Sequence, residues 1–376
     1  MKNRRWLIPF AMLLAILFAG CQRRPLENMY SATVKVIVKC IWKVKAYPEK
    51  PTGVTLYFFR DGEVSPRIVT TSDVDSCEVQ LPAGHYKLFM ITQSPEEYWT
   101  MRFMNMNKYR EAEVELEQKT TKWFTRIGDE EVAQNPESIA VGIAEEFDIT
   151  EDQVEEYQEF YQLWRTKTKA MTKTKTKGSM PTKSDEEELR EIEERVRYTT
   201  ITIPVDPHNI VSQFHVTIYS DNADVLMSVR AATTGMARTF ELTQNTTGRE
   251  TATQLIEQDW TLTMDDEARR IGHLDGIITT FGLPNGEVPT AVRDSSLNVS
   301  ALLIDNKTQE DYVFSVGDKI QILEPNPGYR HLYRLIFGSV ENPAIHPPDV
   351  APANGLGGFD VTVDAWEEGE TVEIPM

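Results

Sequence analysis

The amino-acid sequence predicts a mainly β protein, with two tandem antiparallel β-sandwiches and a helical and disordered insertion between them. Apolar and polar residues alternate in short runs over residues 33–120 and again over 198–376, which is typical of half-buried strands. Gly, Pro, Asn and Asp residues separate these runs, as in a sandwich built from many short strands. Residues 121–197 show helical periodicity and a Lys/Thr-rich tract instead.

The first twenty residues have the pattern of a signal peptide. A positively charged start, with Lys2, Arg4 and Arg5, precedes an apolar run over 6–19. This run is shorter than the roughly 20 apolar residues that a membrane-spanning helix needs. We therefore expect residues 1–20 to direct export and to be removed.

Small residues precede the first cysteine, and the sequence LFAGC over 17–21 resembles the lipobox of bacterial lipoproteins. That resemblance implies cleavage before Cys21, a diacylglycerol on its sulfur and acylation of its new amino group. Several acyl chains on one residue would give stable membrane anchoring. Residues 21–32 would then form a tether. The alternative is an ordinary signal peptide followed by an unmodified cysteine.

The composition excludes several classes of function. A formal net charge of -19 disfavours nucleic acid as a partner, because phosphate binding needs a basic surface. The six histidines form no HExxH motif, and the sequence has no nucleophile elbow, P-loop or Rossmann fingerprint. We therefore expect neither an enzyme nor a bound metal or cofactor.

Two further cysteines, Cys40 and Cys77, lie on the apolar faces of predicted strands. A disulfide between them is compatible with a compartment outside the cytoplasm, where such bonds persist. Two buried thiols are the alternative, and the sequence leaves both open. The absence of a CxxC motif gives no support to a redox or zinc site.

The first sandwich is predicted to begin with a strand over 34–44. Val34, Val36 and Val38 share one face of this strand, whereas lysines occupy mainly the other face. The strands that follow are predicted over 54–59, 67–71, 77–81 and 85–91.

The insertion over 121–197 contains two predicted helices. Thr150 and Gln153 form a capping box before a helix whose aromatic stripe is expected to pack on the first sandwich. The Lys/Thr-rich runs over 165–169 and 173–179 have no apolar content, so we expect this tract to be a solvated, disordered loop rather than to fold back on acidic residues. Ser184 and Glu187 predict a second cap, which opens a helix reaching about Arg197.

The second sandwich is predicted to begin near residue 198 and to end with a strand over 359–366. The other predicted strands cover 199–203, 214–219, 225–229, 239–242, 260–264, 277–281, 297–304, 312–316 and 319–323.

Several of these features together resemble the fimbrillin-like lipoproteins of Bacteroidales, in particular fimbrial anchor and accessory subunits. They are the lipobox, the sequence LPAGHY over 81–86 and a last strand that ends in Val363-x-x-Trp366. The resemblance implies two transthyretin-like sandwiches, a structural or adhesive role at the outer membrane, and other fimbrillin-like subunits as partners. The residues after Cys21, QRRP over 22–25, leave open which side of that membrane the protein faces.

The resemblance further implies assembly by β-strand addition, in which an extended segment of one subunit completes the sheet of another. The candidate edges are the first strand, with Val34, Val36 and Val38, and the last, with Phe359, Val361 and Val363. Ordinary intramolecular edge strands are the alternative for both.

A glycan-binding lipoprotein of a polysaccharide-uptake system is the rival interpretation. Tyr98-Trp99 and Trp123-Phe124 lie in or beside predicted loops, and Trp260 begins a strand. Exposed aromatic rings of this kind can stack on sugars. Packing of these rings in the cores is the alternative.

Overall fold

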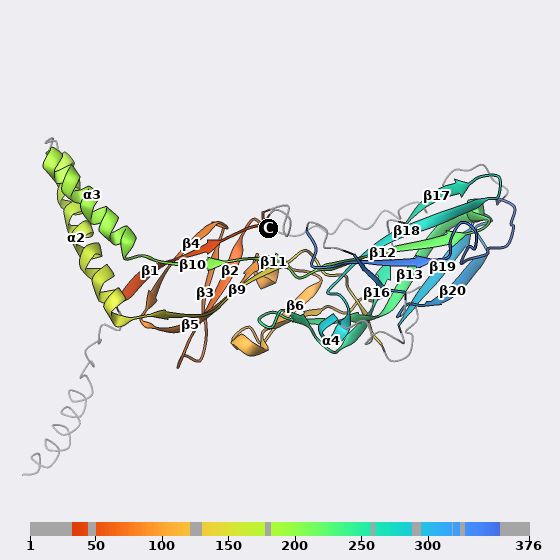
Figure 1. Ribbon diagram of the computed structural model, residues 1–376, viewed down its shortest axis with the longest axis horizontal. Helices are drawn as coiled ribbons and strands as arrows, with labels where there is room; N and C mark the ends of the chain where they lie inside the picture. Colours follow the sequence, from red (N-terminus) through yellow and green to blue (C-terminus); the bar gives the residue numbers. More distant parts are fainter. Residues whose placement is uncertain are drawn as a thin grey trace, which may run out of the picture.

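The computed structural model describes residues 32–43, 50–120, 130–176, 182–256, 260–287, 295–317, 319–323 and 328–353. The chain forms two β-sandwiches in a row, with a helical hairpin at one end (Figure 1). The predicted mainly β fold is thereby confirmed. Cys21 and the last predicted strand, with Phe359, Val361 and Val363, lie outside the described residues.

The first sandwich consists of a three-stranded and a five-stranded sheet. The smaller sheet has the order β10-β1-β4, with β10 over Ile201–Val205, β1 over Thr33–Cys40 and β4 over Ser76–Pro82. The larger has the order β11-β9-β5-β2-β3, with β11 over His208–Asn209, β9 over Ala140–Ile149, β5 over Gly84–Thr92, β2 over Val54–Arg60 and β3 over Arg67–Thr71. Their apolar faces meet in one buried cluster.

Strand β1 shows why alternation alone does not give a strand its place in a sheet. Val34, Val36 and Val38 are fully buried, as the sequence predicts. However, β1 pairs with β4 on one side and with β10, in parallel, on the other. Both rows of its backbone groups are therefore hydrogen-bonded within the chain, and the expectation that β1 is an edge strand is corrected.

The motif LPAGHY connects β4 to β5. The Tyr86 hydroxyl donates a hydrogen bond to the Pro82 carbonyl oxygen at 2.9 Å, which closes the turn on itself. A Cβ atom at Gly84 would lie 2.5 Å from the Arg60 side chain, so glycine permits this close approach.

The segment 121–197, expected as an insertion, contributes both strand and helix. Strand β9 belongs to the first sandwich, and helices α2, over Glu151–Thr176, and α3, over Lys183–Tyr198, form the projecting hairpin (Figure 1). Val154 and Tyr157 of α2 are buried in the core of the first sandwich, which holds the base of the hairpin.

The expectation of a disordered Lys/Thr tract is wrong, because α2 continues through it as far as Thr176. Lys167 lies 2.8 Å from Asp185 and 2.6 Å from Glu188, both in α3. The Thr172 and Thr176 hydroxyls each donate to a carbonyl oxygen one turn earlier, at 2.9 Å. The acidic partner helix and these local hydrogen bonds thus compensate for the missing apolar face.

The second sandwich contains two five-stranded sheets around the largest buried cluster. One has the order β20-β19-β13-β16-β8, with β20 over Gln309–Ser315, β19 over Ser296–Leu303, β13 over Leu226–Ala237, β16 over Thr251–Ile256 and β8 over Val132–Ala133. The other has the order β17-β18-β12-β22-β21, with β17 over Thr261–Asp266, β18 over Ile271–Thr280, β12 over Ser212–Ser220, β22 over Leu332–Phe337 and β21 over Gln321–Leu323.

A small four-stranded sheet joins the two sandwiches. Its order is β15-β14-β7-β6, with β15 over Thr246–Thr247, β14 over Thr239–Glu241, β7 over Glu113–Leu116 and β6 over Met101–Met104, and the short helix α4 lies beside it over Pro284–Glu287. Phe89 of β5, Phe240 of β14 and Phe281, which follows β18, lie in the same buried cluster. The sandwiches are therefore joined by a common core. Among the residues described, no helix is long and apolar enough to cross a membrane.

Candidate interaction site

The second sandwich has an open side where its two sheets end. Strands β20 and β21 are the terminal strands of the two sheets. They lie on the same side of the sandwich, because the Phe314 ring of β20 contacts the Phe337 ring of β22, the neighbour of β21, with ring centroids 4.6 Å apart. We call the edges of β20 and β21 together the open seam.

Ile322 in β21 is an inward-facing side chain that no described residue covers. It lies directly opposite Tyr333 in the antiparallel pair of β21 and β22, and directly opposed residues point to the same face of a sheet. Tyr333 is buried in the core, whereas the Ile322 side chain is 55% exposed. Among the described residues, the inner face of β21 is therefore left partly uncovered at Ile322.

Strand β20 provides the backbone part of the site. Tyr312 and Phe314 point inward and pack against the core, whereas Val313 points outward and is 70% exposed. Among the strands that the structure describes, β20 pairs with β19 alone. No described strand pairs with its other row of N–H and C=O groups.

The side chain of Tyr312, in β20, carries a hydroxyl without a hydrogen-bond partner in the described part of the chain. Its oxygen is buried and has no hydrogen-bond partner among the described residues. Burial, and then the charge of Glu310, raise the pKa of Tyr312 to about 12. Burial of a hydroxyl without a hydrogen-bond partner is unfavourable, because the group loses its hydrogen bonds to water.

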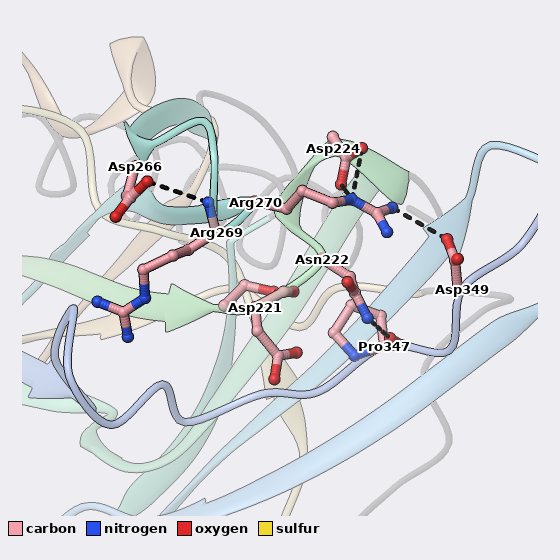
Figure 2. A network of polar contacts seen from close by, with 9 residues as sticks. Asp221, Asn222, Asp224, Asp266, Arg269, Arg270, Pro347 and Asp349 are labelled. Carbon is pink, nitrogen blue, oxygen red and sulfur yellow. Dashed lines mark hydrogen bonds and ion pairs between the residues drawn. The ribbon is translucent and has the colours of Figure 1, made fainter.

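A network of polar contacts fixes the end of the described chain over the tip of the second sandwich (Figure 2). Arg270 lies 2.8 Å from Asp224 and 3.0 Å from Asp349, and the Asn222 side chain donates to the Pro347 carbonyl oxygen at 3.0 Å. Further on, the Ala353 N–H donates to the Ile304 carbonyl oxygen at 3.1 Å. The described chain therefore ends beside the turn between β19 and β20, close to one end of the seam.

The aromatic residues predicted as glycan contacts have different surroundings. Tyr98 is buried, and its hydroxyl donates to the Thr92 carbonyl oxygen at 2.7 Å. Trp99 is 86% exposed. Trp260 is partly buried against the core, and Trp123-Phe124 lie outside the described residues.

The other predicted site residues do not gather at the seam. Val34, Val36 and Val38 lie inside the first sandwich, and Cys40 and Cys77 are buried free thiols in the same core. Sequence reasoning missed Ile322, because only the pairing with Tyr333 shows that this residue faces inward. Within the described ranges, no group of three or more His, Cys, Asp or Glu residues is arranged to hold a metal ion.

The fold and the seam together define a protein with two β-sandwiches in tandem and an exposed strand edge. The chain belongs to the family DUF5119, described as a domain of unknown function, which matches residues 20–257. No curated protein matches the sequence.

Solved structures share this architecture. A candidate adhesin from Bacteroides ovatus ATCC 8483 superposes with a TM-score of 0.53 at 12% identity, over 88% of this chain and 99% of that chain. The fimbrial anchor protein Mfa2 from Porphyromonas gingivalis gives a TM-score of 0.40 at 10% identity, over 81% of this chain and 90% of that chain. The match to the Bacteroides ovatus protein shows that the two chains share their overall fold.

Proposed function

We propose that the chain is a cell-envelope lipoprotein that serves as a structural or adhesive subunit of a surface fibre, as a fimbrial anchor or accessory component. It would be held at the outer membrane by lipid on Cys21 and would join other fimbrillin-like subunits by strand addition at the open seam. The observation that carries this proposal is the exposed, inward-facing Ile322, together with the edge of β20 that no described strand pairs with. The description of the Bacteroides ovatus protein as a candidate adhesin supports an adhesive role.

Strand addition supplies the binding energy in two parts. The unpaired N–H and C=O groups of β20 would form a new ladder with the incoming strand, and its alternate side chains would cover Ile322, Tyr312 and Phe314. The backbone hydrogen bonds give affinity that depends little on sequence. The inward side chains give selectivity for strands with large apolar residues at every second position.

The last predicted strand of this chain has the pattern required of a donor. Phe359, Val361 and Val363 fall on one face, and Asp360 and Thr362 fall on the other. The described chain ends at Ala353, beside the β19–β20 turn. We propose that this segment enters the seam of a neighbouring fimbrillin-like subunit, so that each subunit both accepts and donates a strand.

The acceptor half of the proposal is tested with Ile322→Asp in the full chain, expressed with its neighbouring subunits. A charge beside the core would oppose docking of an apolar strand, so high-mass, detergent-resistant assemblies should be lost. Gln321→Asp places the same charge on an exposed side chain of the same strand and should leave the assemblies intact. Equal behaviour of the two variants on a native gel would refute the seam as the acceptor.

The donor half is tested separately with Val361→Asp. This substitution should abolish the assemblies, because it places a charge on the inward face of the donated strand. Thr362→Asp, on the opposite face, is the matched control and should assemble normally. If Val361→Asp assembles as well as the control, another segment is the donor.

Lipid attachment is tested with Cys21→Ser. The unchanged chain should incorporate labelled palmitate and partition into the detergent phase of an envelope extract. The variant should do neither. Incorporation of label into the variant would contradict anchoring through Cys21.

Glycan binding is a second candidate function, favoured by the fixed and exposed Trp99. Glu137 accepts hydrogen bonds from the backbone N–H groups of Trp99 and Thr100, at 2.8 and 3.0 Å, which holds the loop in place. An exposed indole on a backbone held in this way is a suitable platform for a sugar ring. Trp99→Ala should abolish retardation on an affinity gel that contains the cognate polysaccharide, and unchanged mobility in every polysaccharide tested would exclude this role.

A further inference from the structure

Two cysteines from different strands meet in the core of the first sandwich. Cys77 of β4 pairs directly with Val38 of β1, and Cys40 follows two residues later on the same face of β1. The Cys40 N–H donates to the Asp75 carbonyl oxygen at 3.1 Å, so the two strands are still hydrogen-bonded at this point. Both cysteine side chains are buried.

The two cysteine side chains are diagonal neighbours on this buried face. Hydrogen bonding to the Cys77 side chain lowers the pKa of Cys40, and the same contact, together with burial, raises the pKa of Cys77. The Cys77 thiol lies 2.9 Å from the Asp73 carbonyl oxygen, and the Cys40 sulfur lies 3.5 Å from the Met90 sulfur. Contacts with Asp73 and Met90 therefore fix the position of each thiol in the core.

We propose that Cys40 and Cys77 are joined by a disulfide that fastens β4, an edge strand of the three-stranded sheet, to β1. Cys40 and Cys77 are diagonal neighbours on the same face of paired strands, so the side chains and the two strands must shift toward each other to reach bonding distance. The presence of the bond in the cell rests on the proposed envelope location, because disulfides persist in oxidising compartments. Whether the purified chain can form the bond does not depend on that location.

The oxidation follows ordinary thiol–disulfide exchange. The thiolate of one cysteine attacks an oxidised small disulfide, which forms a mixed disulfide and releases one thiol. The second cysteine then attacks the protein sulfur of that mixed disulfide and releases the second small thiol. Two S–H bonds are lost and one S–S bond forms, while the two electrons and two protons reduce the added disulfide. Because buried thiols react slowly, the bond would form during folding.

The consequence for assembly is that β1 and β4 are fixed to each other. The bridge would close the chain segment that contains β2 and β3, which restricts the unfolded chain and stabilises the fold. A partner strand could then displace neither β1 nor β4 without first reducing the bond. Strand exchange is thereby directed away from these two strands.

The test uses the full chain, unfolded in urea and refolded in a mixture of oxidised and reduced glutathione. Trypsin cleaves after Lys39, Lys43, Arg67 and Lys87, so Cys40 and Cys77 fall in separate peptides, and a third peptide contains Cys21. Mass spectrometry should find the first two peptides linked, about 2 Da lighter than their sum. Reduction should separate them.

The controls distinguish this bond from other fates of the thiols. Refolding in reduced glutathione alone should leave both peptides unlinked, and Cys77→Ala should give no linked peptide. The unchanged chain refolded with oxidised glutathione should also unfold at a higher urea concentration than Cys77→Ala refolded in the same way. Free Cys40 and Cys77 after oxidative refolding, or linkage of either to Cys21 instead, would overturn the proposal. Because this experiment requires neither membrane nor partners, its outcome is independent of the fibre role.

Discussion

At the junction between the sandwiches, the carboxylate of Glu115 lies between two guanidinium groups. Its side chain, in β7, is only 8% exposed. Arg102 of β6 contacts one carboxylate oxygen, and Arg238, between β13 and β14, contacts the other at 2.9 Å. Because Arg238 comes from the second region, this cluster ties the two sandwiches together.

Removal of the Glu115 carboxylate should therefore weaken the whole chain. Glu115→Ala leaves Arg238 with only the more exposed Glu131 as an ion-pair partner, and we expect the free energy of unfolding to fall by about 2 kcal/mol. Glu111→Ala, an exposed control that loses only a surface ion pair with Lys108, should cost less than about 0.5 kcal/mol. Urea unfolding of the two variants measures the difference. Equal losses would show that the junction does not depend on this carboxylate.

The Tyr312 hydroxyl gives a second prediction for a single residue. Since its oxygen lacks a partner in the described chain, Tyr312→Phe should not lower the free energy of unfolding of the isolated subunit. The same variant should weaken the assembled fibre, because it removes a donor that an added strand would satisfy. Urea titration of subunit and fibre separates the two effects. A destabilised subunit would mean that the hydroxyl already has a partner.

At the scale of elements, the helical hairpin is sensitive to acid. Hydrogen bonds from Lys167, and then from Thr182, lower the pKa of Asp185 to about 2. Because the folded-state pKa is lowered, the stabilisation is present at neutral pH and is lost as pH falls through that value. Asp185→Asn should therefore melt at a lower temperature than the unchanged chain at pH 7, as followed by helical ellipticity. The difference should vanish near pH 2, and a constant difference would contradict the assignment.

The hairpin also shows what local sequence can and cannot predict. The capping box of Thr150 and Gln153 is confirmed, with both reciprocal hydrogen bonds present. The second cap falls on Thr182 and Asp185 rather than on Ser184 and Glu187. Both pairs satisfy the same spacing rule, so spacing alone could not choose between them. The helical state of the tract around Lys167 was not predicted, because its acidic partners lie about twenty residues away in α3 and the local composition does not reveal them.

At the scale of the whole molecule, alternation predicted most strands but not their neighbours. The strand over 34–44 is real as far as Cys40, yet its place in the middle of a sheet depends on β10, more than 150 residues later in the chain. The open seam could not be predicted from the sequence either. Ile322 and Tyr312 lie at an edge only because of the order of the strands in the two sheets. Pairing over long sequence distances decides both features, and local patterns carry no information about it.

Hydrogen exchange of β20 tests most directly whether the seam accepts a strand. We expect the amides of 309–315 that point away from β19 to exchange quickly in the Val361→Asp subunit purified away from its neighbouring subunits, because no intact donor strand is then present. In assembled wild-type chains the same amides should become protected, because an added strand pairs with them. Central strand β12 should be protected in both states and serves as the internal reference. Equal exchange of β20 in the two states would contradict strand addition at the seam.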